Sequence, residues 1–186
     1  MVLMADMAPN TSTKKNIPSV KQLMQPLEFT PEDLEANRRG NLGEWQQERL
    51  RSLQRRAMLI GATGFVAFAL SATTFLYFGQ LHDSPVLLLI GIFLTFLNAL
   101  FVGIFGRQWM RLQSDLRANS VEVISGELER VVKASGRANN FLLRLNDAEF
   151  YVKKETFNLF RHEEPYHFYR APHSQVLLAA EPDVRQ

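Results

Sequence analysis

The chain has 186 residues, no cysteine and a formal net charge of +2 at pH 7. The lack of cysteine excludes disulfides, thiolate catalysis and cysteine-based zinc sites, and it agrees with a reducing compartment. Residues 120–186 carry nine basic and ten acidic side chains, a balance of −1. This part of the chain therefore lacks the basic surface that usually accompanies nucleic-acid binding.

The N-terminal residues 1–29 are expected to form a disordered arm. Residues 1–15 are polar or small without periodicity, and they lack the apolar run of a signal peptide. Residues 30–56 are expected to form a cytoplasmic helical segment. Thr30 can cap its first helix, because a threonine hydroxyl accepts a hydrogen bond from a free backbone N–H at a helix start. Gly40 suits the left-handed position that ends a helix.

Two uncharged apolar stretches follow and predict a membrane hairpin. No charged residue occurs in 57–81 or in 84–106. Each stretch is longer than the roughly 20 residues that cross a hydrocarbon core. We assign transmembrane helices to residues 57–79 and 85–106, joined by an external connector at 80–84.

Small residues recur at helical spacing in both spans, which predicts that the spans pack closely on each other. In lipid, small side chains let two helix backbones approach and gain dispersion contact, although glycine is also common in membrane helices generally. Asn98, near the middle of its span, is expected to form a helix–helix hydrogen bond rather than a functional site. The predicted packing residues are Ala57, Gly61, Gly64, Ala67, Ser71, Gly91, Thr95, Asn98 and Gly106.

Arginines lie just before the first span and just after the second, whereas the connector between the spans carries neither lysine nor arginine. By the positive-inside rule, both termini are then cytoplasmic and the protein belongs to the inner or plasma membrane. In the simpler interpretation these arginines only determine topology. Alternatively they bind anionic lipid headgroups, to which a basic juxtamembrane cluster is attracted. The candidate headgroup residues are Arg49, Arg51, Arg55, Arg56, Arg107 and Arg111.

After the second span, residues 107–119 are expected to continue as a juxtamembrane helix. Trp109, Leu112 and Leu116 fall on one face of this helix, at positions i, i+3 and i+7. The face could lie on the membrane surface or pack against the segment before the first span. The sequence leaves both options open.

From residue 120 the hydrophobic period changes to two, which predicts a cytoplasmic β domain over residues 120–186. Five short strands and one helical turn are expected, with a bulge at Gly126 in the first strand. This pattern predicts a small, partly open barrel of the SH3-like or OB-like kind. A five-stranded sheet with one face covered would fit as well.

The clearest soluble signal is a hairpin around the turn 146–147. Asparagine and aspartate both tolerate positive φ, so a two-residue turn is plausible there. The register then places Leu143 opposite Phe150 on an apolar side of the hairpin. On the other side Arg144 lies opposite Glu149, an opposite-charge pair.

The aromatic side chains of this domain have two interpretations. Phe141, Phe150 and Phe168 are expected in the core, while Tyr151 and Tyr169 are candidate surface residues for a protein partner, because tyrosine is enriched at interfaces. As an alternative function, the aromatics would form a stacking platform in a nucleic-acid-binding barrel at the membrane. Core packing is favoured, since the domain has no basic excess.

A histidine cluster supports a second alternative, a membrane-tethered metal-dependent hydrolase. His162 and His167 would be the ligands and Glu163 the base. The helical zinc motif needs histidines four positions apart, whereas these are five apart and Pro165 interrupts them. A polar turn with a strand histidine facing solvent is therefore the favoured interpretation.

The two ends of the chain carry a resemblance. The arm Thr30-Pro31-Glu32-Asp33-Leu34-Glu35-Ala36-Asn37-Arg38-Arg39-Gly40 and the tail Phe168-Tyr169-Arg170-Ala171-Pro172-His173-Ser174-Gln175-Val176-Leu177-Leu178-Ala179-Ala180-Glu181 resemble those of uncharacterised bacterial two-helix membrane proteins with a C-terminal cytoplasmic β domain. The resemblance implies the layout of the chain and no activity.

These observations together predict a non-enzymatic integral membrane anchor or accessory subunit. Its hairpin would hold the β domain at the cytoplasmic surface, where the domain binds a protein partner or a second copy of the chain. Apart from the histidine cluster of the hydrolase alternative, no residue pattern points to a metal or a cofactor, and neither is expected.

Overall fold

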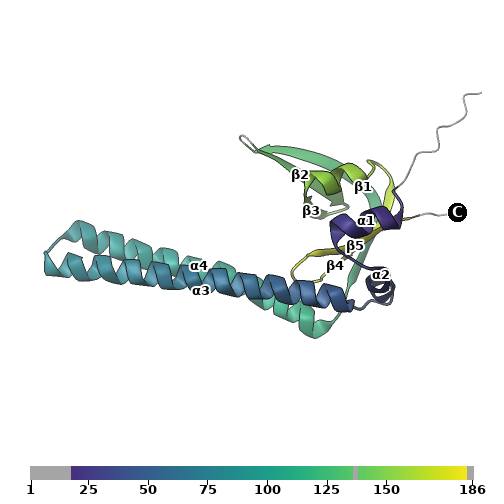
Figure 1. Ribbon diagram of the computed structural model, residues 1–186. Coiled ribbons are helices and arrows are strands. Elements are labelled where there is room, and N and C mark those ends of the chain that lie inside the picture. The colour runs from purple at the N-terminus through teal and green to yellow at the C-terminus, as the bar shows by residue number, and fades with distance from the viewer. Residues whose placement is uncertain (1–17, 136–137, 184–186) are drawn as a thin grey trace, which may run out of the picture.

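The computed structural model describes residues 18–135 and 138–183, and in it a helical hairpin projects from a small β domain (Figure 1). Two long apolar helices followed by a β domain were predicted, and this layout is confirmed. The elements in chain order are α1 (Val20–Leu27), α2 (Pro31–Arg38), α3 (Glu44–Leu81), α4 (Pro85–Ala118), β1 (Glu122–Ser135), β2 (Ala138–Leu145), β3 (Ala148–Val152), α5 (Lys154–Leu159), β4 (Pro165–Arg170) and β5 (Leu177–Pro182).

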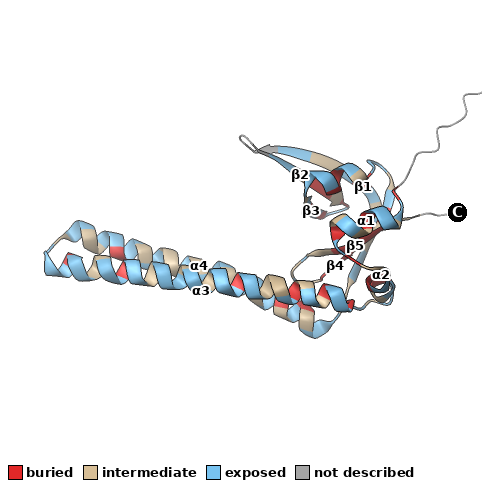
Figure 2. Cartoon of the chain, viewed as in Figure 1, coloured by how far each residue is buried: buried red, intermediate tan, exposed pale blue. Residues whose placement is uncertain are grey.

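The hairpin consists of α3 and α4, which run antiparallel side by side (Figure 1). Their 38 and 34 residues correspond to about 57 and 51 Å at 1.5 Å per residue. Both helices are long and apolar enough to cross a membrane, and their surfaces beyond the β domain are mostly exposed (Figure 2). Residues 107–118 continue α4 without a break, as predicted for the juxtamembrane helix.

The sheet is antiparallel, with strand order β3-β2-β1-β4-β5. The long strand β1 changes partner along its length: Glu122–Glu127 pair with β4, and Leu128–Ser135 pair with β2. This change of partner curls the sheet into a half-barrel whose outermost strands are β3 and β5. The predicted β domain is therefore a curled five-stranded sheet.

Gly126 lies where β1 changes partner, but it does not form the predicted bulge. The pairing of β1 with β4 runs through Gly126 without interruption, and the register shift lies between Tyr169 and Arg170 in β4. A Cβ on Gly126 would be 2.6 Å from Oδ1 of Asn146. The glycine is therefore explained by a close approach of the β2–β3 turn.

The β2–β3 hairpin has the predicted register. Leu143 pairs with Phe150, and Arg144 pairs with Glu149. Asn146 has a φ of 51° at the turn, as a two-residue hairpin turn requires. The Arg144 and Glu149 side chains form an ion pair at 2.8 Å.

The main core of the β domain includes a helix that was not predicted. Residues 20–29 were expected to belong to a disordered arm, but α1 packs against β5 and buries Leu23 completely and Leu27 almost completely. Figure 1 shows α1 lying against the sheet. An apolar stripe at i, i+3, i+4 and i+7 explains the packing; it consists of Val20, Leu23, Met24 and Leu27. Residues 1–17, the rest of the expected arm, lie outside the described residues.

A second, smaller core joins the β domain to the hairpin. Leu50 of α3, Leu112 of α4 and Leu178 of β5 are buried together there. Leu116 packs against the same cluster. Two of the three residues on the face that the sequence left open, Leu112 and Leu116, therefore pack against the start of α3 and the end of the sheet.

Candidate functional site

The loop between β4 and β5 lies against the base of the hairpin and is fixed there by one carboxylate. Asp115 of α4 accepts hydrogen bonds from the backbone N–H groups of His173 at 2.8 Å and Ser174 at 2.7 Å. Its side chain is fully buried. A buried carboxylate that accepts two amide hydrogen bonds is well satisfied, and it holds the loop in one position. No local pattern in the sequence indicates this contact, because the partners are 58 and 59 positions apart.

A second junction ties the N-terminal arm to the last strand. Arg38 of α2 forms a two-pronged ion pair with Glu181 of β5. The Tyr169 hydroxyl donates a 2.6 Å hydrogen bond to the same carboxylate. Burial would raise the pKa of Glu181, but the hydrogen bonds from Arg38 and Tyr169 outweigh it and lower that pKa. Burial and the bond to Glu181 raise the pKa of Tyr169 to about 12.

These contacts overturn one of the two predicted partner residues. Tyr169 was expected on the exposed face of its strand, but only 4% of it is exposed. Residues before the hairpin explain the difference, because Phe29 and Leu34 belong to the same buried cluster as Tyr169, and Arg38 of α2 binds the carboxylate that accepts the Tyr169 hydrogen bond. Tyr169 is therefore a structural residue that links β4, β5 and α2.

Tyr151 lies on the surface, as predicted. It is 67% exposed and belongs to β3, an outer strand of the sheet. A groove of about 490 Å³ runs beside it and is lined by β3, by the end of α1, by Arg49 of α3 and by residues 174–177 at the start of β5. Tyr151 is thus an exposed aromatic side chain at the open seam of the half-barrel.

The charged side chains around Tyr151 neutralise one another. Arg144 is paired with Glu149 at 2.8 Å and with Glu129 at 3.4 Å, and Lys133 is paired with Glu149 at 3.2 Å. Ion pairing of Arg144 raises its pKa and lowers that of Glu149. The β2–β3 face therefore presents a mixed polar surface without a free basic stripe.

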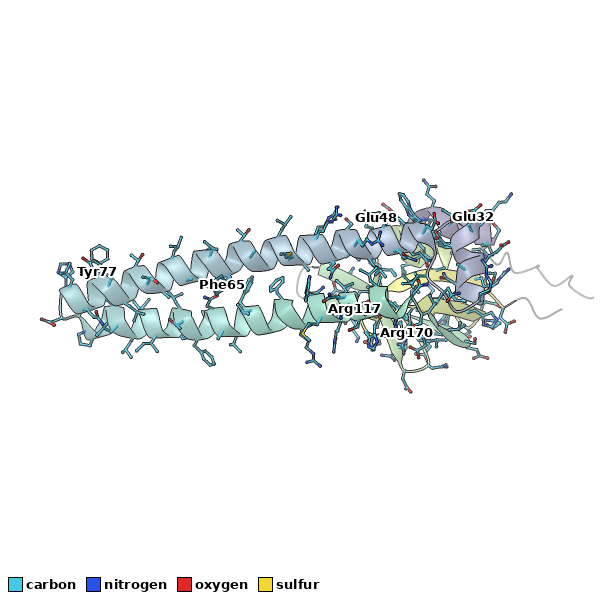
Figure 3. All side chains as sticks on the ribbon, turned by 90° about the horizontal axis from the view of Figure 1, so that it is seen from below. Glu32, Glu48, Phe65, Tyr77, Arg117 and Arg170 are labelled. Carbon is cyan, nitrogen blue, oxygen red and sulfur yellow. The ribbon has the colours of Figure 1, made fainter. Side chains whose placement is uncertain are left out.

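The candidate headgroup arginines divide into two groups. Arg49 donates a 2.8 Å hydrogen bond to the Leu27 carbonyl oxygen, and Arg51 lies 3.6 Å from Glu48. By contrast, Arg56, Arg107 and Arg111 line one groove of about 560 Å³ at the base of the hairpin, and Arg55 is exposed outside it. Figure 3 places Arg117 and Glu48 at this end of the hairpin and Tyr77 at the opposite tip.

The small residues of the spans contact large ones on the partner helix instead of one another. A Cβ on Gly64 would be 2.3 Å from the Phe101 ring, and one on Gly91 would be 2.6 Å from Cγ of Leu76. Gly61 faces Phe105 more loosely, at 3.4 Å. The two helices thus pack closely, with each of these glycines providing a recess for a bulky side chain of the other helix rather than meeting another small residue.

The other predicted packing residues differ in whether they are buried between the two helices. Ala57 is buried, whereas Ala67 and Gly106 are exposed, and nothing lies within 4 Å of a Cβ on Gly106. The hydroxyl groups of Ser71 and Thr95 donate to carbonyl oxygens one turn earlier in their own helices, at 2.9 Å each.

Asn98 does not make the expected interhelical hydrogen bond through its carbonyl oxygen. Oδ1 is shielded from solvent and has no hydrogen-bond partner among the described residues. In an apolar setting such an oxygen is costly to leave unpaired.

The two histidines of the hydrolase alternative have separate partners. His162 Nδ1 accepts from the Arg130 backbone N–H at 3.1 Å. His167 Nδ1 lies 2.6 Å from Ser125 Oγ, and its Nε2 lies 3.6 Å from Asp183. Within residues 18–135 and 138–183, no group of three histidine, aspartate or glutamate side chains is placed to hold a metal ion.

The serine, histidine and aspartate just described do not match a catalytic triad. In a triad the serine bonds to Nε2 and the acid to Nδ1 of the histidine, whereas here the two nitrogens are used the other way round. The 3.6 Å separation from Asp183 is also too long for a hydrogen bond.

The best-defined features are therefore the groove at the hairpin base and the exposed β2–β3 face. The base is assembled from α3, α4 and the β4–β5 loop, and the face comes from one continuous hairpin. No protein-family model, no curated protein and no solved structure matches the chain.

Proposed function

We propose that this protein is a two-pass anchor of the inner or plasma membrane that presents a cytoplasmic β domain to a protein partner. One observation carries the proposal: large apolar side chains are exposed along the whole hairpin up to a base rich in arginine, where a folded domain is docked. Such a surface is unfavourable in water, and exposed apolar patches of this size mark contact with a membrane or a protein. The side chains include Ile60, Phe65, Leu70, Phe93, Phe96 and Ile104.

The arginine distribution supports cytoplasmic termini. Arginines occur at the base of both helices, and the connector between Leu81 and Pro85 has none. Positive charge remains on the cytoplasmic side during insertion. Both chain ends would then share the cytoplasmic side with the β domain.

The partner surface we propose is the β2–β3 face around Tyr151. Of the two barrel kinds considered, we favour the OB-like one, because β1 is shared by both halves of the sheet and α5 lies between β3 and β4. In OB-like barrels the face of strands 2 and 3 commonly binds oligonucleotides and oligosaccharides, and the analogy is used here for the position of the binding face and not for its ligand. This last step is an analogy of fold, and Tyr151 supplies the exposed aromatic anchor that protein interfaces favour.

A protein partner fits this face better than a nucleic acid. Arg144 and Lys133 are both committed to carboxylates, so they offer phosphates little net positive potential. The phenylalanines of the alternative stacking platform are core residues, since Phe150 and Phe168 are buried. An open strand edge at β3 also allows a partner to add a strand.

The topology can be tested because the chain has no cysteine. A single His82→Cys substitution places a thiol in the exposed connector, and Lys154→Cys places one on α5 of the β domain. In intact cells an impermeant maleimide should label His82→Cys and should label Lys154→Cys only after permeabilisation. The reverse pattern would contradict the proposed orientation.

The partner can be tested by photocrosslinking in native membranes. A benzophenone amino acid at position 151 should give a discrete adduct with another protein or a second copy of the chain. The same amino acid at position 45 is a matched control, because Trp45 is also an exposed aromatic residue, on α3. Equal adducts at both positions, or none at 151, would argue against the β2–β3 face.

A further inference from the structure

We propose that the groove at the hairpin base is a binding site for the headgroup of one anionic phospholipid. This inference rests on the membrane placement proposed above and adds a defined ligand to it. The groove has a volume of about 560 Å³ and is formed by α3, α4 and the β4–β5 loop. Its lining residues are Leu53, Arg56, Ala57, Ile60, Ile104, Phe105, Arg107, Gln108, Arg111, Leu112, Ser174 and Val176.

The charges of the groove are all of one sign. It has three arginines, Arg56, Arg107 and Arg111, and its lining contains no aspartate or glutamate. The nearest acid along α4 is Asp115, one turn after Arg111, and its oxygens are taken by the amides of the β4–β5 loop. The groove therefore favours an anion.

The three arginines are also unengaged, unlike several arginines elsewhere in the protein. Arg38, Arg49 and Arg170 each pair with a carboxylate. Among the described residues, Arg56 and Arg107 have no ion pair or hydrogen bond, and the same holds for Arg111. Guanidinium groups match a phosphate bidentately, so three free ones around a single groove indicate a phosphate ligand.

The position of the groove distinguishes a lipid from a soluble phosphate. Its arginines lie at the end of the two uncharged spans, which is the level of the lipid headgroups. Ile60, Ile104 and Phe105 continue the lining towards the membrane. A second groove of about 480 Å³ adjoins Arg107 and Arg111 and is open beside Gly103 and Gly106, which leaves room for an acyl chain.

The site is pre-organised on its third side. Ser174 and Val176 of the β4–β5 loop line the groove, and Asp115 fixes that loop on α4. A ligand bound there does not have to order the loop, so less conformational entropy is lost on binding. This separates a site for one lipid from the general attraction of a basic surface to an anionic membrane.

The test is native mass spectrometry of the full-length protein in mild detergent, with equal amounts of phosphatidylglycerol and phosphatidylcholine of the same chain length. We expect one retained lipid, with phosphatidylglycerol preferred about tenfold or more. The variant R56Q/R107Q/R111Q should bind it about a hundredfold more weakly, since each basic residue near an anionic surface contributes roughly a fivefold factor. The variant R51Q/R55Q/R117Q removes three arginines outside the groove and should retain the lipid.

Several outcomes would overturn the inference. Equal losses in the two triple variants would indicate diffuse attraction, and no preference for phosphatidylglycerol would remove the site. Displacement of the lipid by inorganic phosphate would indicate a free-anion site. If the groove triple does not fold, the single variant Arg107→Gln replaces it, with about fivefold weaker binding expected and unchanged binding counting against the site.

A failure of the membrane proposal can be distinguished from a failure of the headgroup site. Resistance of the wild-type protein to alkaline carbonate extraction tests membrane integration alone. An integral protein without lipid preference would overturn only the headgroup site, whereas an extractable protein would overturn both.

Discussion

Arg38 and Glu181 are 143 positions apart in the sequence and form an ion pair that joins the N-terminal arm to the last strand of the β domain. The Glu181 side chain is largely buried, and Tyr169 bonds to it as well. The arm is consequently part of the folded domain, and residues 120–186 alone lack a wall of their own core.

Removing the Glu181 carboxylate should destabilise the protein measurably. Hydrogen bonds to charged groups contribute about 1.5–3 kcal/mol, so Glu181→Ala should lower the melting temperature of the full-length protein in detergent by roughly 3–12 °C. Glu122→Ala is the matched control, because Glu122 pairs with Arg170 at 2.9 Å on an exposed part of the sheet. It should change stability by less than about 1 kcal/mol. Equal shifts would show that the Arg38 junction has no special importance.

The raised pKa of Tyr169 predicts a dependence on alkaline pH. Its folded pKa of about 12 lies above the ordinary tyrosine value of 10, so its stabilising contribution is complete below pH 10 and is lost as the pH rises towards 12. Melting temperatures of wild type and Tyr169→Phe should therefore differ most near pH 8 and converge towards pH 11. A constant difference over this range would contradict the assignment.

Shortening a buried side chain of α1 should destabilise the β domain if this helix is part of the core. Leu23→Ala removes a fully buried side chain and should cost about 2–5 kcal/mol. Lys21→Ala on the exposed side of the same helix should change the melting temperature little. An unaffected Leu23→Ala protein would restore the expectation of a disordered arm.

Asp115→Ala should release the β4–β5 loop from α4. Two partly buried backbone N–H groups would lose their acceptor, and the cost for each should be at or below the roughly 1–3 kcal/mol of a fully buried unsatisfied group. Hydrogen exchange at His173 and Ser174 should accelerate strongly, while Ser114→Ala, an exposed neighbour, should leave both amides protected. Unchanged protection in Asp115→Ala would mean that other contacts hold the loop.

The glycines of the hairpin should differ in their tolerance of alanine. Gly91→Ala places a methyl group 2.6 Å from Cγ of Leu76 and should cost about 1–3 kcal/mol through overpacking. Gly106→Ala meets nothing within 4 Å and should be neutral or slightly stabilising, because alanine is the better helix former. The comparison is made by thermal unfolding in detergent, and equal effects would contradict the described packing of α3 on α4.

Local patterns were sufficient to predict the spans and the β2–β3 hairpin. The pairs Leu143–Phe150 and Arg144–Glu149 follow from alternation around a single turn, and an uncharged stretch needs only its length to qualify as a span. The glycine spacing indicated that the helices pack, but it could not identify the partner of each glycine. Phe101 fills the recess at Gly64, and this depends on the axial alignment of the two helices.

Contacts between residues distant in sequence account for the predictions that were wrong or missing. Tyr169 was misplaced because strand alternation indicates which residues share a face and not what covers that face. Asp115 and Glu181 have partners in other parts of the chain, so no local pattern marks them. For α1 a signal did exist, since Leu23 and Leu27 are four positions apart, but Pro26 inside the helix weakens it.

The shared core constrains how the chain can be threaded through a bilayer. Leu23 lies before the hairpin and Leu128 after it, yet both are buried in the same core. If only one of the two helices crossed the membrane, these leucines would be in different compartments and the β domain could not close. In the proposed membrane placement, a folded β domain therefore requires α3 and α4 to cross the bilayer together, and a chain with only one of them inserted would leave this core incomplete.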